Sequence, residues 1–251
     1  MKAILLAAGR GTRISRCIDG KPKCTIPLGE AVTLIEYTID LFHRNGIADV
    51  TVVLGYQGYV IRAILAGRNV RFVENPFYDV TNSIASLWFA RSTFAACSDF
   101  LIMNGDVFLS QQALDAVLEE DRSPVLFYDT TRREGADYKF QCDGDRLVQY
   151  GKDLSLDETS GEYIGCARFG SEFTGTFVAR LEELIRTQSH SMWWEDVLYS
   201  LTPERGIIAR DLAGAFWGEV DYIEDYERIT AYCREHAEDI LPVCAVGGAG
   251  K

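Results

Sequence analysis

The sequence predicts an α/β domain built on a mostly parallel sheet flanked by helices. Between residues 3 and 73, apolar or β-branched runs alternate with stretches of helical periodicity, in the order strand, helix, strand, helix, strand. That order is typical of parallel strands joined by crossover helices. The 251 residues suffice for one large domain, and neither a repeat nor a linker interrupts them. We therefore predict a single domain over residues 1–251.

The elements of the first half follow from their apolar patterns and caps. Residues 3–8 are an apolar run, which we expect to be a buried strand. A helix capped by Thr81 or Asn82 is expected near residue 84, and Ser110 is the expected cap of a later helix. The other expected elements are a helix over 30–42, a strand over 49–54, a helix over 58–65, and strands over 70–73 and 100–107, followed by a helix over 111–119.

The second half has a different texture. Residues 137–150 predict a β-hairpin around an Asp143-Gly144 turn, and we treat residues 130–165 as a small β insertion. Residues 243–251 are small and glycine-rich and predict a flexible tail. The remaining expected elements are strands over 124–129, 162–169, 206–210 and 215–221 and helices over 171–186, 197–201 and 225–236.

Composition excludes several classes of function. The net charge of −12 argues against a nucleic-acid or anionic-membrane surface, which would need clustered Lys and Arg. The sequence contains no run of about 20 apolar residues, so we expect no membrane span. The seven cysteines include no CxxC pair, and Met1-Lys2 runs directly into the expected first strand, so we expect no secretory signal. We therefore expect reduced thiols and a cytoplasmic protein.

A glycine-rich turn follows the first strand. Gly9 and Gly11 permit positive φ and close approach to a ligand, and exposed amides in such a loop bind anions. Arg13 and Lys23 would add positive charge. The turn fits neither a dinucleotide fingerprint, because Ile14 stands where a third glycine is needed, nor a P-loop. By local physics alone, a phosphate loop and a plain tight turn remain equal alternatives.

The residues of this turn resemble the opening motif of the nucleotidyltransferase superfamily. The matching stretch is Leu6-Ala7-Ala8-Gly9-Arg10-Gly11-Thr12-Arg13, with Pro22-Lys23 following. Members join a nucleoside triphosphate to a phosphorylated small molecule. The resemblance implies that the loop from Gly9 to Arg13, together with Lys23, holds the triphosphate.

Two carboxylates lie at predicted strand ends. Asp106 lies near the end of the strand expected over 100–107, and Asp221 ends the strand expected over 215–221. Open parallel sheets bind ligands beyond the carboxyl ends of their strands. Asp106 could instead cap the next helix, but Ser110 is better placed for that. Asp106 and Asp221 could share one Mg²⁺, which proteins usually hold with one or two carboxylates plus phosphates and water.

Further motifs resemble the phosphocholine cytidylyltransferase branch of the superfamily. In chain order they are Asn75-Pro76-Phe77-Tyr78, Thr81-Asn82-Ser83, Ser86-Leu87-Trp88, Asn104-Gly105-Asp106-Val107, Lys139, Gly151-Lys152, Tyr163-Ile164-Gly165, Trp194-Glu195-Asp196 and Glu219-Val220-Asp221. The branch implies a Rossmann-like nucleotidyltransferase fold that uses CTP and Mg²⁺. It implies catalysis by Lys23, Arg13, Asp106 and Asp221, with the last two as metal ligands. It also implies cytosine recognition by Thr81, Asn82, Ser83 and Ser86 beside Gly105, and phosphate neutralisation by Lys139 and Lys152.

Aromatic and acidic residues suggest where the acceptor head would bind. A quaternary ammonium is attracted to aromatic faces, and nearby acids strengthen the attraction. The candidates are Trp193, Trp194, Trp217 and Tyr128, with Glu195, Asp196 and Glu219 close in sequence. Each tryptophan could instead fill the core. A primary amine would fit the same residues nearly as well.

Our leading hypothesis is cytidylyl transfer from CTP to phosphocholine, giving CDP-choline and pyrophosphate. The alternatives are a cytidylyltransferase for 2-aminoethylphosphonate, phosphoethanolamine or inositol phosphate, a sugar-1-phosphate nucleotidyltransferase, and an inactive nucleotide-binding regulatory module. We expect CTP and a small phosphorylated acceptor as partners, with no nucleic acid. The sequence leaves a homodimer open.

Overall fold

One large mixed sheet forms the centre of the chain. The computed structural model describes residues 1–11, 19–30, 32–94 and 98–240, so the predictions made for Thr12, Arg13 and the tail 243–251 lie outside the described residues. The nine strands run in the order β5-β4-β1-β6-β11-β8-β12-β10-β9. Their bounds, in chain order, are β1 (Lys2–Ala7), β4 (Asp49–Leu54), β5 (Arg71–Glu74), β6 (Phe100–Asn104), β8 (Val125–Asp129), β9 (Lys139–Asp143), β10 (Arg146–Gly151), β11 (Gly161–Phe169) and β12 (Ile208–Asp211).

The predicted parallel arrangement is confirmed for the first half of the sheet. Strands β5, β4, β1 and β6 are parallel neighbours, as are β8 and β12. Strand β11 is inserted between β6 and β8 and is antiparallel to both, which makes the whole sheet mixed. The predicted hairpin β9–β10 belongs to the same sheet, because β9 pairs with β11 and β10 pairs with β12. The expected insertion over 130–165 is therefore part of the main sheet. We propose from this continuity that the chain is one domain.

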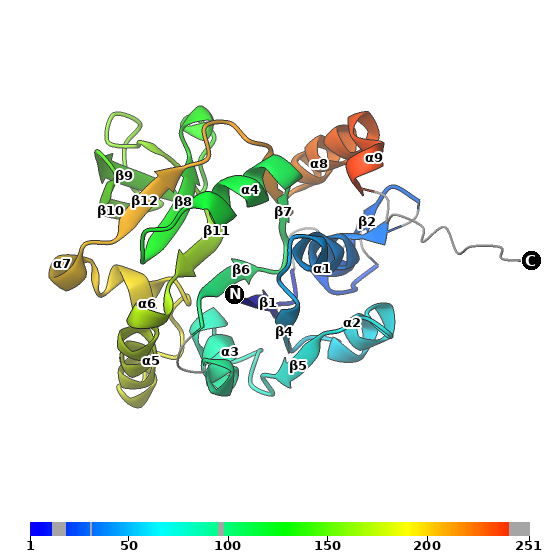
Figure 1. Cartoon of the computed structure of the whole chain (residues 1–251), viewed down its shortest axis with the longest axis horizontal. Helices are drawn as coiled ribbons and strands as arrows, with labels where there is room; N and C mark the ends of the chain where they lie inside the picture. The colour runs from blue at the N-terminus through cyan, green and yellow to red at the C-terminus, as the bar shows by residue number, and fades with distance from the viewer. Residues whose placement is uncertain (12–18, 31, 95–97, 241–251) are drawn as a thin grey trace, which may run out of the picture.

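The helices cover both faces of the sheet (Figure 1). Strand β1 shows the division, because its alternate side chains point to opposite faces. Ala3 and Leu5 belong to the core shared with α1, α4 and α8, whereas Ile4 and Leu6 belong to the core shared with α3, α5 and α6. The helices are α1 (Leu34–Arg44), α2 (Gly58–Ile64), α3 (Ser83–Phe89), α4 (Gln111–Glu119), α5 (Ser171–Arg186), α6 (Asp196–Tyr199), α7 (Thr202–Arg205), α8 (Ile223–Glu235) and α9 (Ala237–Ile240).

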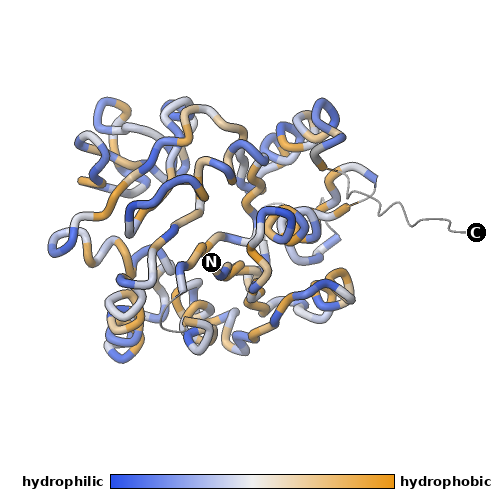
Figure 2. Tube along the Cα trace, viewed as in Figure 1, coloured by the Kyte–Doolittle hydropathy of each residue, from blue (hydrophilic) through white to orange (hydrophobic). Residues whose placement is uncertain are grey.

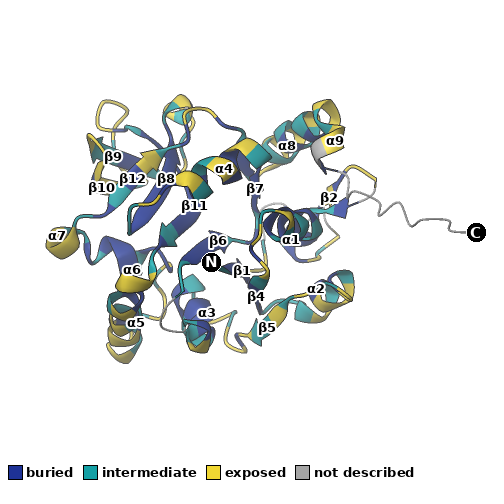
Figure 3. Cartoon of the chain, in the orientation of Figure 1, coloured by how far each residue is buried: buried dark blue, intermediate teal, exposed yellow. Residues whose placement is uncertain are grey.

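Burial follows the layers. The central strands are dark blue in Figure 3, while α5 alternates buried and exposed residues along its length. The same helix shows alternating hydrophilic and hydrophobic bands in Figure 2, as an amphipathic helix on a sheet should. Within the part of the chain that the structure describes, no helix combines the length and apolarity needed to cross a bilayer.

Two predicted elements differ from those observed. The helix expected over 30–42 begins only at Leu34, because Thr33 caps it and the preceding residues form a small two-stranded sheet of β2 (Pro27–Leu28) and β3 (Val32–Thr33). The strand expected over 100–107 is broken by a turn at Gly105-Asp106. The chain continues as β7 (Val107–Leu109), which pairs outside the main sheet with β13 (Trp217–Glu219).

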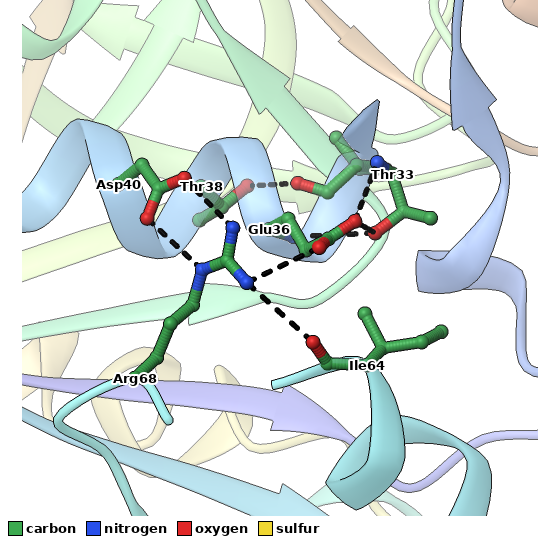
Figure 4. A network of polar contacts seen from close by, with 7 residues as sticks. Thr33, Glu36, Thr38, Asp40, Ile64 and Arg68 are labelled. Atoms are coloured by element: carbon green, nitrogen blue, oxygen red, sulfur yellow. Dashed lines mark hydrogen bonds and ion pairs between the residues drawn. The ribbon is translucent and has the colours of Figure 1, made fainter. Parts of the chain in front are cut away.

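A polar network fixes the start of α1 (Figure 4). The Thr33 hydroxyl accepts from the Glu36 amide at 3.4 Å, and the Glu36 carboxylate accepts from the Thr33 amide at 2.9 Å, which together form a capping box. Arg68 donates to both oxygens of Asp40 at 3.0 Å and to Glu36 at 3.1 Å. Residues near the end of α2 are thereby tied to the first two turns of α1.

We predict that Thr33→Ala lowers the free energy of unfolding by about 0.5–2 kcal/mol, because the first-turn amides of α1 lose their acceptor. Urea unfolding monitored by circular dichroism measures the change. Thr33→Ser is the control and should remain close to wild type, since it keeps the hydroxyl. Equal stability of the alanine and serine variants would contradict the capping role.

Candidate functional site

The small sheet of β7 and β13 brings the two predicted metal ligands together. In its antiparallel register Glu219 lies opposite Val107, and the Val220 amide donates to the Asp106 carbonyl at 3.0 Å. Asp106 therefore lies beside the end of β13, where Asp221 follows. Residues 115 positions apart in the chain meet because the turn at Gly105-Asp106 directs the chain out of the main sheet.

The turn requires a glycine at position 105. The Gly105 amide donates to the Leu6 carbonyl at 2.8 Å, and a Cβ at this position would lie 2.7 Å from that oxygen. Any side chain would therefore push β6 away from the end of β1. The backbone of the Asp106 turn is held in this way against the strand that leads into the glycine-rich loop.

Lys23 lies between the carboxylates. Its Nζ is 2.6 Å from Asp106 Oδ2, and it also forms an ion pair with Asp221. All three side chains are largely shielded, with side-chain exposures of 12% for Lys23, 21% for Asp106 and 18% for Asp221. Lys23 belongs to the segment that follows the loop, so this contact joins the N-terminal motif to the ends of β6 and β13.

Electrostatics at this cluster are strongly coupled. Burial alone would lower the pKa of Lys23, but the charges of Asp106, Asp221 and Glu219 outweigh it and raise the pKa above its usual value. Burial raises the pKa of Glu219 well above its usual range, and the charge of Asp106 raises it further. The ammonium therefore stays charged and partly neutralises a site rich in carboxylates.

The same carboxylates fit a divalent cation. Asp106, Glu219 and Asp221 each offer an oxygen, and these oxygens lie within 4.8 Å of one another. Carboxylate oxygens are the ligands that Mg²⁺ prefers. Lys23 already shows that a positive charge is stable between Asp106 and Asp221.

The predicted nucleotide-binding residues line one cavity of about 300 Å³. Every predicted residue of this group that the structure describes takes part in the lining, namely Leu6, Ala7, Ala8, Gly9, Gly11, Lys23, Thr81, Asn82, Ser83, Ser86, Gly105 and Asp106. Thr12 and Arg13 lie outside the described residues. Gly11 has a φ of 62°, and its Cα lies close to the Lys23 side chain. Gly9 does not have a positive φ, so the expectation is wrong for that glycine.

Small polar groups form part of the lining of this cavity. Asn75 is buried, and its Nδ2 donates to Thr81 Oγ1 at 3.2 Å and to Ser86 Oγ at 3.0 Å. Asn82 caps α3 through the Ser83 amide at 2.8 Å. The buried amide of Asn75 thus fixes two hydroxyls that could pair with the edge of a nucleobase.

A second cavity of about 300 Å³ lies next to the first. The two share Gly11, Lys23, Asn104, Asp106, Trp193 and Glu219. Of the predicted acceptor residues, this cavity is lined by Lys152, Trp193, Glu195 and Glu219. Lys152 forms a 2.7 Å ion pair with Asp137, another lining residue.

Three predicted acceptor residues line neither cavity. Trp217 is buried and donates Nε1–H to Asp129 Oδ2 at 2.9 Å. Trp194 is fully buried, and Lys139 Nζ donates to the Leu154 carbonyl at 2.7 Å. Tyr128 also belongs to the core. Of the three tryptophans expected to form a cage, only Trp193 is exposed, because the turn before α6 and strand β13 direct Trp194 and Trp217 inward.

Several lining residues were missed from the sequence. Tyr138, Tyr163 and Tyr199 come from the start of the hairpin, from β11 and from α6, and they line the second cavity with Asp137, Glu162 and Asn104. Tyr163 and Asn104 lie within family-like motifs, but no role was assigned to either. Tyr199 follows Glu195 by four residues, a spacing that could have indicated a shared helical face.

Asn104 connects the buried Trp194 to Glu195. The Trp194 indole N–H can only donate, and it donates to Asn104 Oδ1 at 2.8 Å. Asn104 Nδ2 therefore faces Glu195 and donates to Oε1 at 3.3 Å. Burial raises the pKa of Glu195 to about 8, although the Asn104 hydrogen bond acts in the opposite direction.

We predict that Trp217→Phe lowers the free energy of unfolding by about 1–3 kcal/mol, because the buried Asp129 oxygen loses its donor. The KM for the acceptor should stay near wild type, since Trp217 lies outside both cavities. Urea unfolding and steady-state kinetics measure the two effects. Trp193→Phe is the comparison variant, for which we expect a raised KM and little change in stability. A raised acceptor KM in Trp217→Phe with unchanged stability would contradict the structural role.

Comparison with known proteins agrees with this geometry. The choline-phosphate cytidylyltransferase of Streptococcus pneumoniae is 22% identical over 91% of this chain and 96% of its own length. The CTP:phosphoglutamine cytidylyltransferase of Campylobacter jejuni is 24% identical over 90% of this chain and 98% of its own. The solved inositol-1-phosphate CTP transferase of T. maritima has the same fold, with a TM-score of 0.72 at 21% identity, covering 94% of this chain and 96% of its own.

The model of the MobA-like NTP transferase domain matches residues 3–159. This match covers more than half of the chain, from the first strand through the hairpin. The predicted nucleotidyltransferase resemblance and α/β fold are confirmed, and the chain belongs to the MobA-like NTP transferase domain family.

Proposed function

We propose that the chain transfers a cytidylyl group from CTP to a small phosphorylated acceptor with a positively charged head, releasing pyrophosphate. The observation that carries the proposal is the pair of cavities that meet at Lys23, Asp106 and Glu219. One is lined by the glycine-rich turn and small polar groups, the other by aromatic and acidic side chains. A transfer between two substrates is accelerated when the reacting atoms are held close together and correctly oriented. Two cavities that share lining residues can hold the two substrates in this way.

The reaction needs no nucleophile from the protein. An acceptor phosphate oxygen attacks the α-phosphorus of CTP and forms a new P–O bond. The bond from that phosphorus to the oxygen bridging the β-phosphate breaks, and its electrons leave with pyrophosphate. The acceptor oxygen is already ionised near neutral pH, so no strong base is required. The described lining of both cavities accordingly contains no histidine.

Charge neutralisation is the main task of the protein in such a transfer. Lys23 is the cation at the junction, and it would orient the triphosphate together with the loop, including Thr12 and Arg13. Asp106 and Asp221, with Glu219 beside them, would hold Mg²⁺. When bound, this ion stabilises negative charge on the phosphates.

Several of the similar proteins support CTP as the nucleotide. The relatives from S. pneumoniae and C. jejuni and the T. maritima structure are all named as cytidylyl or CTP transferases, but for three different acceptors. Phosphocholine remains the acceptor that the sequence predicts. Phosphoethanolamine, 2-aminoethylphosphonate and inositol phosphate remain its rivals.

We predict pyrophosphate release from CTP and Mg²⁺ with at least one amine-bearing acceptor. Phosphocholine, phosphoethanolamine, aminoethylphosphonate, inositol-1-phosphate and glucose-1-phosphate would be tested in parallel, and ATP, GTP and UTP would then replace CTP. Turnover with CTP should exceed that with the other nucleotides. No release from any pair would refute the proposed activity, and a preference for glucose-1-phosphate would refute the cationic acceptor.

We predict that Asp106→Ala and Asp221→Ala each lower kcat roughly 100-fold or more, because the charge of the transferred group is no longer stabilised. The circular dichroism spectrum should stay that of wild type. Asp143→Asn, at the exposed end of β9, is the control and should keep full activity. A wild-type rate in either alanine variant would show that the metal assignment is wrong.

A further inference from the structure

Three oxygens of the acceptor cavity are buried without a hydrogen-bond partner. They are Glu195 Oε2, Tyr163 OH and Tyr199 OH. Among the described residues, only four other buried side-chain nitrogen or oxygen atoms lack a hydrogen-bond partner. Buried polar atoms are nearly always satisfied, so three in one cavity wall indicate that a bound molecule supplies the missing partners.

Glu195 is fixed with one oxygen left over. Asn104 donates to Oε1 at 3.3 Å and is itself held by the Trp194 indole, so the carboxylate has one engaged and one unengaged oxygen. Glu195 directly precedes α6 as its N-cap residue, and its carbonyl accepts from the Tyr199 amide at 3.0 Å, one helical turn on. Burial, followed by the charge of Glu195, raises the pKa of both Tyr163 and Tyr199 well above the usual value, as expected when the three groups lie close together.

The tyrosine ring faces are already used in packing. Tyr199 stacks on Tyr150 with centroids 3.9 Å apart and an interplanar angle of 15°. Tyr163 stacks on Phe140 at 5.0 Å and 19°. A quaternary ammonium is recognised by open ring faces. These two rings instead offer hydroxyls.

We propose that the acceptor head is a primary ammonium whose N–H groups donate to Glu195 Oε2 and to the hydroxyl oxygens of Tyr163 and Tyr199. The proposal rests on the proposed function and names the acceptor class within it. A primary ammonium has three N–H donors, which match the three oxygens, and its positive charge would favour the ionised form of the buried Glu195 carboxyl. A trimethylammonium has no N–H and could donate to none of the three oxygens.

The wild-type enzyme tests this directly with two acceptors that differ only in three N-methyl groups. With CTP and Mg²⁺, we expect kcat/KM for phosphoethanolamine to exceed that for phosphocholine by about tenfold or more. An equal or higher kcat/KM for phosphocholine would overturn the inference. A higher kcat/KM for inositol-1-phosphate, which offers uncharged hydroxyls, would overturn it as well.

Variants separate a specificity role from a structural one. Tyr163→Phe should raise the KM for phosphoethanolamine roughly tenfold with little change in kcat, and should leave the KM for phosphocholine near wild type. Glu195→Gln should also reduce the preference for the primary amine. Tyr128→Phe is the matched control, because Tyr128 is the cross-strand partner of Tyr163 but lines neither cavity. A preference unchanged by Tyr163→Phe would overturn the assignment of the hydroxyl.

The outcomes also distinguish this inference from the function on which it rests. No pyrophosphate release from CTP with any acceptor would overturn the transferase activity and the inference together. Efficient turnover that prefers phosphocholine would leave the transferase activity intact and overturn only the primary ammonium.

Discussion

The contact of Lys23 with Asp106 and Asp221 is the interaction on which the rest of the site depends. Each partner comes from a different part of the chain: the segment after the first loop, the turn after β6, and the end of β13. Without the ammonium, the carboxylates of Asp106, Glu219 and Asp221 would repel one another in a shielded site. A protein with a net charge of −12 repels phosphates overall, and Lys23 only partly neutralises its carboxylate neighbours, so binding of the proposed triphosphate would also need the cation that those carboxylates could hold.

Backbone geometry holds that contact in place. The Gly105 amide, directly after β6, donates to the Leu6 carbonyl of β1, and the pairing of β7 with β13 brings residues 217–219 beside the same turn. Three segments distant in sequence are thus joined by main-chain hydrogen bonds, which side-chain substitutions leave largely intact. The backbone therefore fixes the position of the cluster, even though its like charges repel one another. Stability comes mainly from the two apolar cores on either side of the sheet.

The sequence was most informative where chemistry and backbone constraint coincide. The glycine-rich turn and Asp106 could be predicted because they follow the parallel strands β1 and β6, whereas Lys23 and Asp221 were indicated by the short motifs that contain them. The wall of the second cavity could not. Tyr138, Tyr163 and Tyr199 come from three elements, and only their packing brings them together. Trp194 and Trp217 were misassigned because composition does not reveal direction: both point inward and satisfy their indole N–H groups on Asn104 and Asp129.

Asn104 links the two halves of the site. It is the last residue of β6, it lines both cavities, and it directly precedes the turn that carries Asp106. Its amide is held by Trp194 on one side and holds Glu195 on the other. Glu195, which would contact the acceptor head, and Asp106, which lies at the junction of the two cavities, are therefore both positioned by the end of β6. An acceptor bound at Glu195 as proposed would direct its phosphate toward Lys23, so recognition of its head group would also align its reacting end.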